Sequence, residues 1–409
     1  MLTKFTIIIP TRERGEPLHF CIKNLLKQDY ENFEILVSDN NSKDKTAQIV
    51  FAFQDKRIRY VNTGIRVGMA HNWEFALSHV NDGWVLFVGD DDGLLPCALR
   101  TLDAVIKATD CEALTTVNCN YWWPLHFSSM PEGRLTIPLP VESPYEMKNS
   151  AIMLDRVLRG KAAYSELPWL YNGGASSVAL LRRLSTGGRY FNSRNPDIYS
   201  AISLALGTLT YPSINVPIAI NGASKFSSGT SYMLGQKNDP DSPSSLMMGE
   251  SNIPFHSALI VGKSLQIHVY ESYLQAAHLY NEPSCTLLEQ LNLALKLADK
   301  SYFQETVEEC LLMARQNGVT IPSSIKIAIS RISNQFFGLV RRIGQRRVIA
   351  IPAVKLNALD VDTASDAAKY LYGVFDYFFC YSPFTRMNLS IFAFFISLNR
   401  YLRRIFKRE

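Results

Sequence analysis

The first hundred residues alternate between short apolar runs and longer amphipathic stretches. Four runs rich in β-branched and aromatic residues have the length of strands: Phe5–Pro10, Phe33–Ser38, Arg57–Val61 and Trp84–Val88. Apolar residues recur at helical spacing in the three stretches between them, 17–28, 46–53 and 69–80. Strands that alternate with helices are typical of a mostly parallel sheet covered by helices. The N-terminal part of the chain is therefore expected to be an α/β domain.

Acidic residues follow two of these predicted strands. Asp39 comes directly after the second strand, and Asp90, Asp91 and Asp92 follow the fourth. Ligands of open α/β sheets bind beyond the carboxyl ends of the strands. Both acidic groups are therefore expected at the binding edge of the sheet.

The three adjacent aspartates repel one another. Two unit charges about 4 Å apart repel by about 1 kcal/mol in water and by about 4 kcal/mol near a protein surface, so solvent or a cation must screen them. Carboxylate oxygens suit Mg²⁺ or Mn²⁺, which proteins usually hold through one or two carboxylates together with phosphate oxygens. The alternative is a solvated acidic turn in which Asp92 caps the following helix.

Other polar residues near this edge have two interpretations each. The carboxylate of Asp39 can accept hydrogen bonds from a base or a ribose, or it can take part in turn chemistry alone. Arg66 stands between two glycines ahead of a helix, where it can reach a base or a phosphate or simply be solvated. Asn72, in the first turns of that helix, either contacts the same ligand or only pins the loop.

Four segments together resemble a known family. IIIPTRER, VSDNNSKDKT, GIRVGMAHN and FVGDDDGLLP are similar, in order and spacing, to the nucleotide-diphospho-sugar glycosyltransferases of family 2, which have the GT-A fold. The resemblance is specific over about residues 5–100, weaker to about 230 and absent afterwards. It implies a Rossmann-like GT-A domain, a nucleotide-sugar donor, a divalent cation (Mn²⁺ or Mg²⁺) and inversion at the anomeric carbon.

The resemblance also assigns the nucleoside-binding residues. Asp39 matches the family's nucleoside-binding aspartate, and Pro10, Thr11, Arg12 and Glu13 match the loop that lines the nucleobase pocket. Many relatives have an aromatic residue and an asparagine in place of Arg12 and Glu13. This departure concerns how the base is recognised, and it does not affect the family resemblance.

The same resemblance assigns the diphosphate and metal contacts. Asp90–Asp92 match the metal-binding DXD region, with Asp92 as the direct metal ligand, Asp91 near the ribose and Asp90 as a further donor and metal contact. Arg66 matches a basic residue that contacts the donor. Many relatives read DxDD here, whereas this chain has Gly89 in place of the first of those aspartates.

An inverting transfer requires a base that deprotonates the acceptor hydroxyl. The family supplies it from an Asp or Glu about a hundred residues after the aspartate cluster. Asp197, in FNSRNPDIYSAISLAL, is the first candidate, although Pro196 and Asp197 also read as a helix start in which Asp197 is a cap or first-turn charge. Glu166, in YSELPWLYNGG, is the second candidate for the base and is also an acceptor contact.

Two further segments are candidates for contacts with the substrates. Trp122 and Trp123, in YWWP, either stack on an acceptor sugar or are buried structural tryptophans. Lys225, in GASKFSSGTS, is expected to stabilise the departing diphosphate at the edge of the site.

The chain divides into four predicted regions. Residues 1–230 form the GT-A domain, with a donor half of about 1–100 and an acceptor half of about 101–230. The polar segment 231–254 is a flexible loop or linker, and 255–320 form a helical region in which Thr286–Glu289 and Ser301–Gln304 read as capping boxes. Residues 321–409 form a basic amphipathic helical tail.

The tail differs from the rest of the chain in charge. Residues 323–409 contain 14 Lys or Arg and 5 Asp or Glu, a net charge of +9, whereas the whole chain has +5. The longest apolar run there is about ten residues, half of what a membrane span requires. We expect the tail to lie on a membrane surface, and a helical subdomain whose basic face is solvated is the alternative. No nucleic-acid-binding motif is present, so nucleic acid is not an expected partner.

Seven scattered cysteines without CxxC spacing favour a reducing compartment. The expected location is therefore the cytoplasm, at the inner face of the membrane if the tail binds there.

These features predict an inverting, metal-dependent glycosyltransferase. It would move a sugar from a nucleotide-diphospho-sugar, with UDP as the family's commonest nucleotide, to a carbohydrate or lipid-linked hydroxyl in bacterial surface polysaccharide or glycolipid synthesis. A catalytically degenerate sugar-nucleotide sensor or scaffold is the alternative. A nucleotidyltransferase is disfavoured because PTRERGEP lacks the glycine-rich loop expected after its first strand.

Overall fold

The computed structural model describes residues 1–123, 135–138, 143–224, 227, 231, 251–298 and 302–320, and the backbone of 348–350. Most of the predicted linker and nearly all of the predicted tail lie outside these residues. No helix in the part of the chain that the structure describes is long and apolar enough to cross a membrane.

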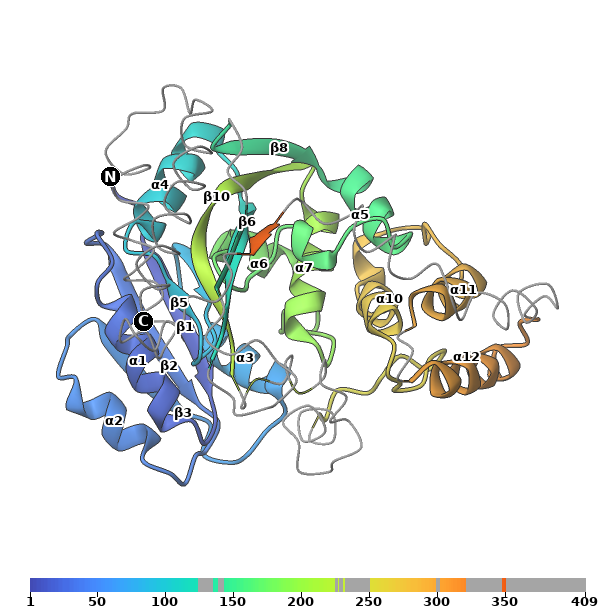
Figure 1. Ribbon diagram of the computed structural model, residues 1–409, viewed down its shortest axis with the longest axis horizontal. Coiled ribbons are helices and arrows are strands. Elements are labelled where there is room, and N and C mark those ends of the chain that lie inside the picture. Colours follow the sequence, from blue (N-terminus) through green and yellow to red (C-terminus); the bar gives the residue numbers. More distant parts are fainter. Residues whose placement is uncertain are drawn as a thin grey trace, which may run out of the picture.

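Four parallel strands form the N-terminal half of the sheet, as the alternating pattern predicted (Figure 1). In spatial order they are β4 (Trp84–Phe87), β1 (Phe5–Thr11), β2 (Phe33–Asp39) and β3 (Ile58–Asn62). The connecting helices are α1 (Gly15–Leu25), α2 (Thr46–Ala52) and α3 (Met69–Ser78). The predicted fold class, a mostly parallel α/β sheet of the GT-A type with helices beyond it, is confirmed.

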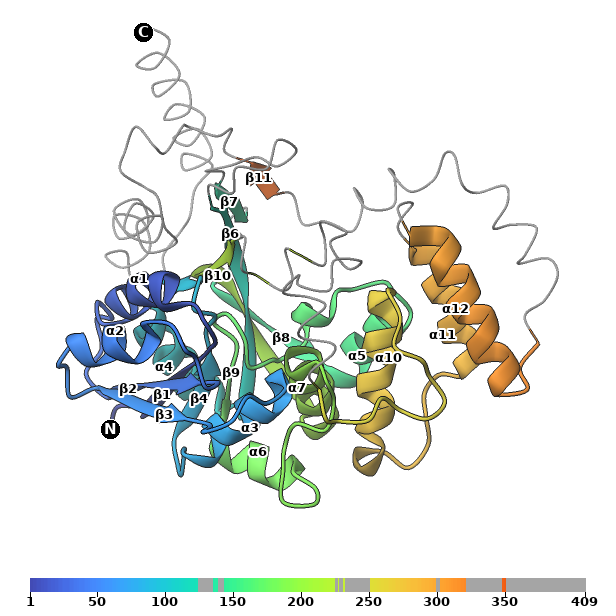
Figure 2. The ribbon, with the colours of Figure 1, turned by 90° about the horizontal axis from the view of Figure 1, so that it is seen from below.

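Both faces of the central strands are buried, which explains their continuous apolar runs. Ile7 and Ile9 of β1 pack into a core with α1 and α4 (Ala98–Thr109), whereas Ile8 faces a second core. In that second core Trp73 of α3 stacks on Phe87 of β4 with ring centroids 4.1 Å apart. Figure 2 shows α1 and α2 on one side of the strands and α3 and α6 (Val178–Leu184) on the other.

The second half of the sheet is mixed. Its strands are β5 (Gly93–Leu94), β6 (Ala113–Trp122), β7 (Leu135–Pro138), β8 (Tyr145–Asn149), β9 (Ala175–Ser177), β10 (Thr210–Ala223) and β11 (Val348–Ala350). The short β9 joins the halves because it pairs antiparallel with both β4 and β6.

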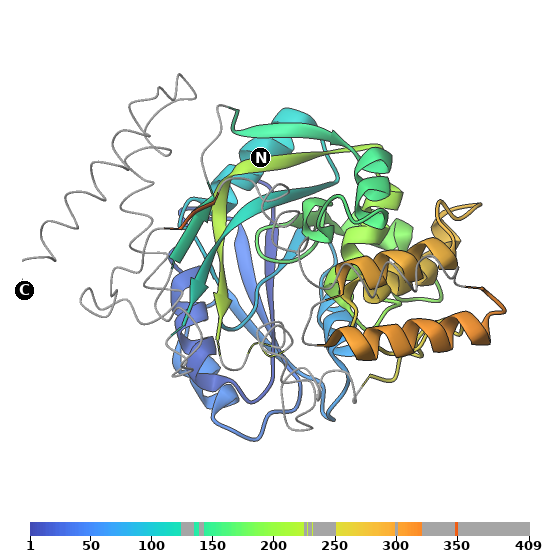
Figure 3. The same cartoon turned by 45° about the vertical axis from the view of Figure 1, so that its right-hand side comes forward.

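The long strands β6 and β10 lie beside one another and run parallel (Figure 3). Their register shifts between Ile214 and Ala219, so β10 is irregular at that point. Beyond the shift, β10 also pairs antiparallel with β5, which directly follows the triple aspartate. The end of β10 is thereby brought against the aspartate cluster.

The C-terminal helices pack on this sheet domain. They are α10 (Leu265–Gln275), α11 (Leu287–Leu297) and α12 (Phe303–Gln316), and α10 lies beside α7 (Pro196–Gly207) in Figures 1 and 2. Residues of α10, α11 and α12 share one apolar core with α3, α5 (Ser150–Leu158), α6 and α7.

Two local predictions for this helical region can be compared with the structure. The Thr286–Glu289 capping box is confirmed: each side chain accepts a hydrogen bond from the other residue's backbone N–H. Helix was expected from residue 255, but α10 begins only at Leu265, and turns precede it. The second predicted box begins at Ser301, outside the described residues, and the helix it was expected to open begins at Phe303.

Candidate functional site

The order of the parallel strands creates a crevice beside β1. The chain passes from β1 to β2 and β3 on one side and then returns to β4 on the other. Ligands of α/β proteins bind at such a switch point, beyond the carboxyl ends of the strands. Thr11 ends β1, Asp39 lies opposite it in β2, and the aspartate cluster follows β4. The two predicted acidic groups therefore lie at one edge.

Asp90 binds the loop after β1. Its carboxylate is 1% exposed and accepts hydrogen bonds from Thr11 Oγ1 at 2.7 Å and from Arg14 Nη1 at 3.0 Å. Burial opposes the charge on Arg14, but Asp90 and Asp91 outweigh it and raise the pKa of the guanidinium above its ordinary value. Arg14 thus supplies a positive charge to the cluster.

Asp91 points toward the end of β10. Its Oδ2 accepts a hydrogen bond from Ser224 Oγ at 2.5 Å, and its backbone carbonyl accepts one from Trp123 Nε1 at 3.2 Å. The residue is 4% exposed. Burial and the neighbouring Asp90 raise the pKa of its carboxyl to about 6.

Asp92 holds three segments together. Its carboxylate accepts hydrogen bonds from the N–H of Gly89 at 3.0 Å, the N–H of Gly222 at 2.6 Å and the hydroxyl of Tyr171 at 2.7 Å. Burial and Asp91 raise the pKa of its carboxyl to about 7.

Gly89 is required by this arrangement. A Cβ at residue 89 would lie 2.5 Å from both Asp92 Oδ2 and the Tyr171 hydroxyl. This crowding explains why a residue with a side chain would disturb the cluster at position 89.

The three carboxylates diverge. Asp90 faces β1, Asp91 faces Ser224, and Asp92 faces Gly222 and Tyr171. Among the described residues no group of three or more His, Cys, Asp or Glu side chains is close enough to hold a metal ion. A Mg²⁺ or Mn²⁺ ion here would have to be held in the way such ions usually are, by one or two carboxylates together with phosphate oxygens of the donor. The assignment of Asp92 as the direct metal ligand and of Asp90 as a further contact stays a prediction.

Asp39 is buried at the end of β2 with both oxygens engaged. Oδ1 accepts a hydrogen bond from the N–H of Ser42 at 3.0 Å, and Oδ2 accepts from Tyr60 Oη at 2.6 Å and Asn62 Nδ2 at 3.1 Å. Burial and the bond to Asp39 raise the pKa of Tyr60 to about 12, so its hydroxyl remains a donor. Turn chemistry therefore accounts for one of the three bonds, and side chains of β3 make the other two.

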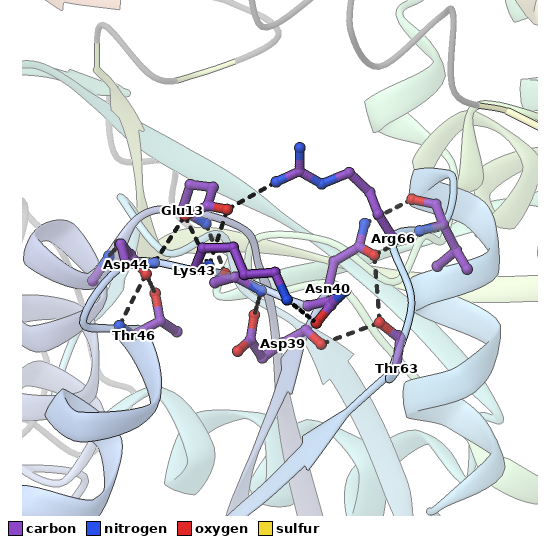
Figure 4. A network of polar contacts seen from close by, with 12 residues as sticks. Glu13, Asp39, Asn40, Lys43, Asp44, Thr46, Thr63 and Arg66 are labelled. Atoms are coloured by element: carbon purple, nitrogen blue, oxygen red, sulfur yellow. Dashed lines mark hydrogen bonds and ion pairs between the residues drawn. The ribbon is translucent and has the colours of Figure 1, made fainter.

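Glu13 and Arg66 form an ion pair close to Asp39 (Figure 4). Arg66 Nη2 lies 2.8 Å from Glu13 Oε1. The Glu13 carboxylate also accepts the backbone N–H groups of Lys43 and Asp44 at 3.0 to 3.1 Å. Glu13 has a φ of 53°, a left-handed conformation that non-glycine residues adopt rarely. The ion pair links the loop after β1 to the loop before α3, on either side of Asp39.

The other predicted donor contacts lie around this edge. Asn72 is bonded to β2, because Ser38 Oγ donates to its Oδ1 at 2.7 Å and its Nδ2 donates to the Ser38 carbonyl at 3.3 Å. Pro10 lies in β1 opposite Ser38, and Arg12 is partly buried in the following loop. Lys225 lies outside the described residues.

The predicted base lies in the first turn of α7. Pro196 is the first residue of this helix, as its sequence position indicated. Asp197 Oδ2 accepts a hydrogen bond from Tyr164 Oη at 2.9 Å, and burial raises the pKa of the Asp197 carboxyl above its ordinary value.

Glu166, the second candidate, has a local structural role. It ends the 3-10 helix η1 (Tyr164–Glu166), and its Oε1 accepts the N–H of Ala163 at 3.2 Å. Lys148 Nζ lies 3.8 Å from its other oxygen.

The tryptophan pair lies beside the aspartate cluster. Trp122 ends β6, and the N–H of Trp123 donates to the carbonyl of Ala223 at 3.1 Å. Both side chains are partly exposed, and the Trp123 indole is bonded to the Asp91 carbonyl as described above.

Sequence reasoning missed four residues whose side chains hold the carboxylates of Asp90–Asp92 and Asp197: Arg14, Tyr164, Tyr171 and Ser224. Arg14 stands in the quoted PTRER motif and was the most accessible of the four to inference. The two tyrosines carry no local signal, because each meets its aspartate only through tertiary contacts.

The mostly parallel α/β sheet carries acidic side chains at its switch point, as the GT-A resemblance led us to expect. Residues 6–122 match the family model described as Glycosyl transferase family 2. The resemblance seen in the motifs is thereby confirmed for these residues.

Curated relatives match the same region. A GalNAc(5)-diNAcBac-PP-undecaprenol beta-1,3-glucosyltransferase of Campylobacter jejuni is 37% identical over 121 residues, 29% of this chain and 38% of that protein. A UDP-Glc:alpha-D-GlcNAc-diphosphoundecaprenol beta-1,3-glucosyltransferase of Escherichia coli is 32% identical over 87 residues, 21% and 34% of the two chains. The chain thus spans less than two fifths of the length of these relatives.

Solved structures show a more distant likeness. Staphylococcus aureus TarS superposes with a TM-score of 0.43 and 16% identity over 76% of this chain and 55% of that one. A mannosyltransferase of Pyrobaculum calidifontis in complex with GDP-Man and Mn²⁺ gives 0.41 and 15%, over 92% and 88%.

Proposed function

We propose that this protein is an inverting glycosyltransferase that moves a sugar from a UDP-sugar to a hydroxyl of a lipid-linked saccharide in bacterial surface polysaccharide synthesis. The observation that carries the proposal is the meeting of Asp39 and the aspartate cluster at the β1–β4 switch point, within the segment that matches family 2. The two curated relatives, glucosyltransferases named for undecaprenol-diphosphate-linked sugars, support the acceptor class.

Different residues of the site are assigned to different parts of the donor. Asp39 and the Glu13–Arg66 pair surround the nucleoside, and the aspartate cluster lies where the diphosphate ends. A divalent cation held with one or two of these carboxylates would neutralise the negative charge of the leaving diphosphate. Arg14 places a positive charge 3.0 Å from Asp90 Oδ1.

Asp197 removes the proton from the acceptor hydroxyl as that oxygen attacks the anomeric carbon. Burial raises the pKa of this carboxyl, which makes it a stronger base than a solvated aspartate. The attacking oxygen arrives opposite the departing diphosphate, so a single displacement inverts the anomeric configuration.

Calorimetry with UDP tests the donor half of the proposal. We expect binding in the presence of Mn²⁺ that is lost with EDTA and weakened by Asp91→Asn. A panel of UDP-sugars with undecaprenyl-diphosphate-linked acceptors, beginning with UDP-glucose, then tests transfer, and Asp197→Asn is expected to bind UDP but not to transfer sugar. Binding by the wild-type protein without transfer to any acceptor would favour the sensor or scaffold, and no binding of any nucleotide would refute the donor site.

A further inference from the structure

One short segment contacts both the predicted base and the aspartate cluster. Its first tyrosine, Tyr164, donates its hydroxyl to Asp197 Oδ2 at 2.9 Å, and its last, Tyr171, donates to Asp92 Oδ2 at 2.7 Å. Trp169 lies between them, with its ring 5.9 Å from that of Tyr164 and 5.7 Å from that of Tyr171. The donor site and the base are therefore linked through residues 164–171.

The backbone of this segment is anchored at several points. Tyr211 Oη of β10 donates to the carbonyl of Glu166 at 2.7 Å, and Thr115 Oγ1 of β6 donates to the carbonyl of Ser165 at 3.2 Å. Near its other end, the N–H of Leu170 donates to Ser200 Oγ of α7 at 3.3 Å. These bonds hold the Tyr164 hydroxyl in a fixed position relative to α7.

We propose that Tyr164 is a positioning residue for the Asp197 base. Its hydroxyl holds Oδ2 and so fixes the plane of the carboxylate, which leaves Oδ1 presented in a constant direction to the acceptor hydroxyl. This inference rests on the proposed function, because it takes Asp197 as the group that accepts the proton.

The hydrogen bond also has an electrostatic consequence. A donor that bonds to a carboxylate favours the ionised form and lowers its pKa, whereas burial of Asp197 raises it. Burial and the nearby Asp197 keep the pKa of Tyr164 well above its ordinary value, so the phenol remains protonated and donating. The Tyr164 hydroxyl therefore favours the ionised form of the Asp197 carboxyl and opposes the effect of burial on its pKa.

Other titratable groups packed around α7 have partners of their own. Glu74 of α3 accepts the N–H groups of Tyr190 and Phe191, at 2.9 and 2.8 Å. On α10, Glu271 accepts from Ser193 Oγ and His268 Nδ1 lies 3.0 Å from Asn195 Nδ2.

The test compares Tyr164→Phe with a matched control, Tyr190→Phe. Tyr190 is fully buried, Tyr164 is partly buried, and the Tyr190 hydroxyl lies 2.7 Å from Ser203 Oγ on the same helix α7. Both variants therefore lose one tyrosine hydroxyl that bonds to α7. We expect Tyr164→Phe to move the acid limb of the kcat/KM–pH profile upward by about 1 to 2 pH units and to lower kcat with little change in donor KM. Tyr190→Phe is expected to leave the limb in place, and equal profiles for the two variants would overturn the proposal.

A second variant keeps the ring and the hydroxyl at position 164 and is expected to shift the acid limb of the kcat/KM–pH profile in the opposite direction. Site-specific 3-fluorotyrosine at position 164 is a stronger hydrogen-bond donor of nearly the same size, so we expect it to move the acid limb downward. A limb that does not move, or that moves upward, contradicts the proposal.

Carboxyl ¹³C NMR on the full chain separates this inference from the proposed function. Asp197 is assigned by the resonance that Asp197→Asn removes, and its pKa is then compared in wild type and Tyr164→Phe without any reaction. If no donor and acceptor give transfer, the proposed function fails, while an upward shift in the Asp197 titration would still support the role of Tyr164. An unchanged titration would refute that role whatever the activity.

Discussion

Replacement of Gly89 by alanine tests the packing of the aspartate cluster. The added Cβ would lie 2.5 Å from both Asp92 Oδ2 and the Tyr171 hydroxyl, and 3.1 Å from the Asp92 carboxyl carbon. Real Cβ atoms do not approach so closely, and neither neighbour is free to move without losing a hydrogen bond. The Asp92 carboxylate must therefore leave its position between Gly89, Gly222 and Tyr171.

The size of the effect follows from the bonds that are lost. A hydrogen bond to a charged group contributes about 1.5–3 kcal/mol, and overpacking of a buried site costs about 1–3 kcal/mol. With partial relaxation, we expect Gly89→Ala to lower the free energy of unfolding by about 2–4 kcal/mol. Urea denaturation followed by tryptophan fluorescence measures this change directly.

Two further variants identify the cause. Gly187→Ala is the control: residue 187 has open space around it and a φ of +58°, so its substitution introduces backbone strain without crowding, at about 1 kcal/mol. Gly89→Ala combined with Tyr171→Phe removes one of the two atoms that clash with the new Cβ, and we expect the double variant to lose less stability than the sum of the two single changes. A stability for Gly89→Ala within about 0.5 kcal/mol of wild type would refute the reasoning.

Three other predictions address the charges of the site and its support. Arg14→Met leaves the buried Asp90 without its cationic partner and is expected to lower stability by about 1–3 kcal/mol, a value reduced because Arg14 is partly exposed; an unchanged urea midpoint would contradict the pairing. Asp39→Asn loses the charge that Tyr60 and Asn62 bond, and we expect calorimetry to show UDP affinity reduced about tenfold or more. Burial raises the pKa of Glu271 above its ordinary 4.5, so the folded state binds this proton more tightly than the unfolded state. Its contribution to stability is complete below pH 4.5 and is lost as the pH rises through the raised pKa, and Glu271→Gln should flatten that part of the stability–pH curve.

The helical region has a direct connection to the predicted base. Two of the three residues before Pro196 contact α10: Ser193 bonds Glu271 and Asn195 contacts His268. The third, Arg194, donates its Nε to the carbonyl of Ile253, in the segment that precedes α10, at 2.7 Å. The loop that sets the start of α7 is thus held by residues outside the family match, 6–122. The contacts that position Asp197 therefore lie beyond the residues that match the family model.

Sequence reasoning was most successful where the signal is local. The strands β1, β2 and β4 and the helix start at Pro196 were predicted because apolar period and proline position are read within a few residues. The start of α10 was placed ten residues too early, because the apolar residues from Phe255 onward pack as turns rather than as a helix. The spacing of apolar residues indicates which side chains are buried and does not fix the backbone conformation. A turn that buries side chains can therefore have the same composition as the end of a helix.

Residue patterns were enough to predict the α/β class, the edge at which Asp39 and Asp90–Asp92 lie, and the resemblance to family 2 over residues 6–122. What each carboxylate bonds depends on how the folded chain packs. Gly222 reaches Asp92 from 130 residues away and Tyr171 from 79, and no local pattern encodes contacts of that separation. The physical reason is that a buried charge must be satisfied by whichever donors the packed strands bring to it, so its partners follow from the fold rather than from its neighbours in the chain.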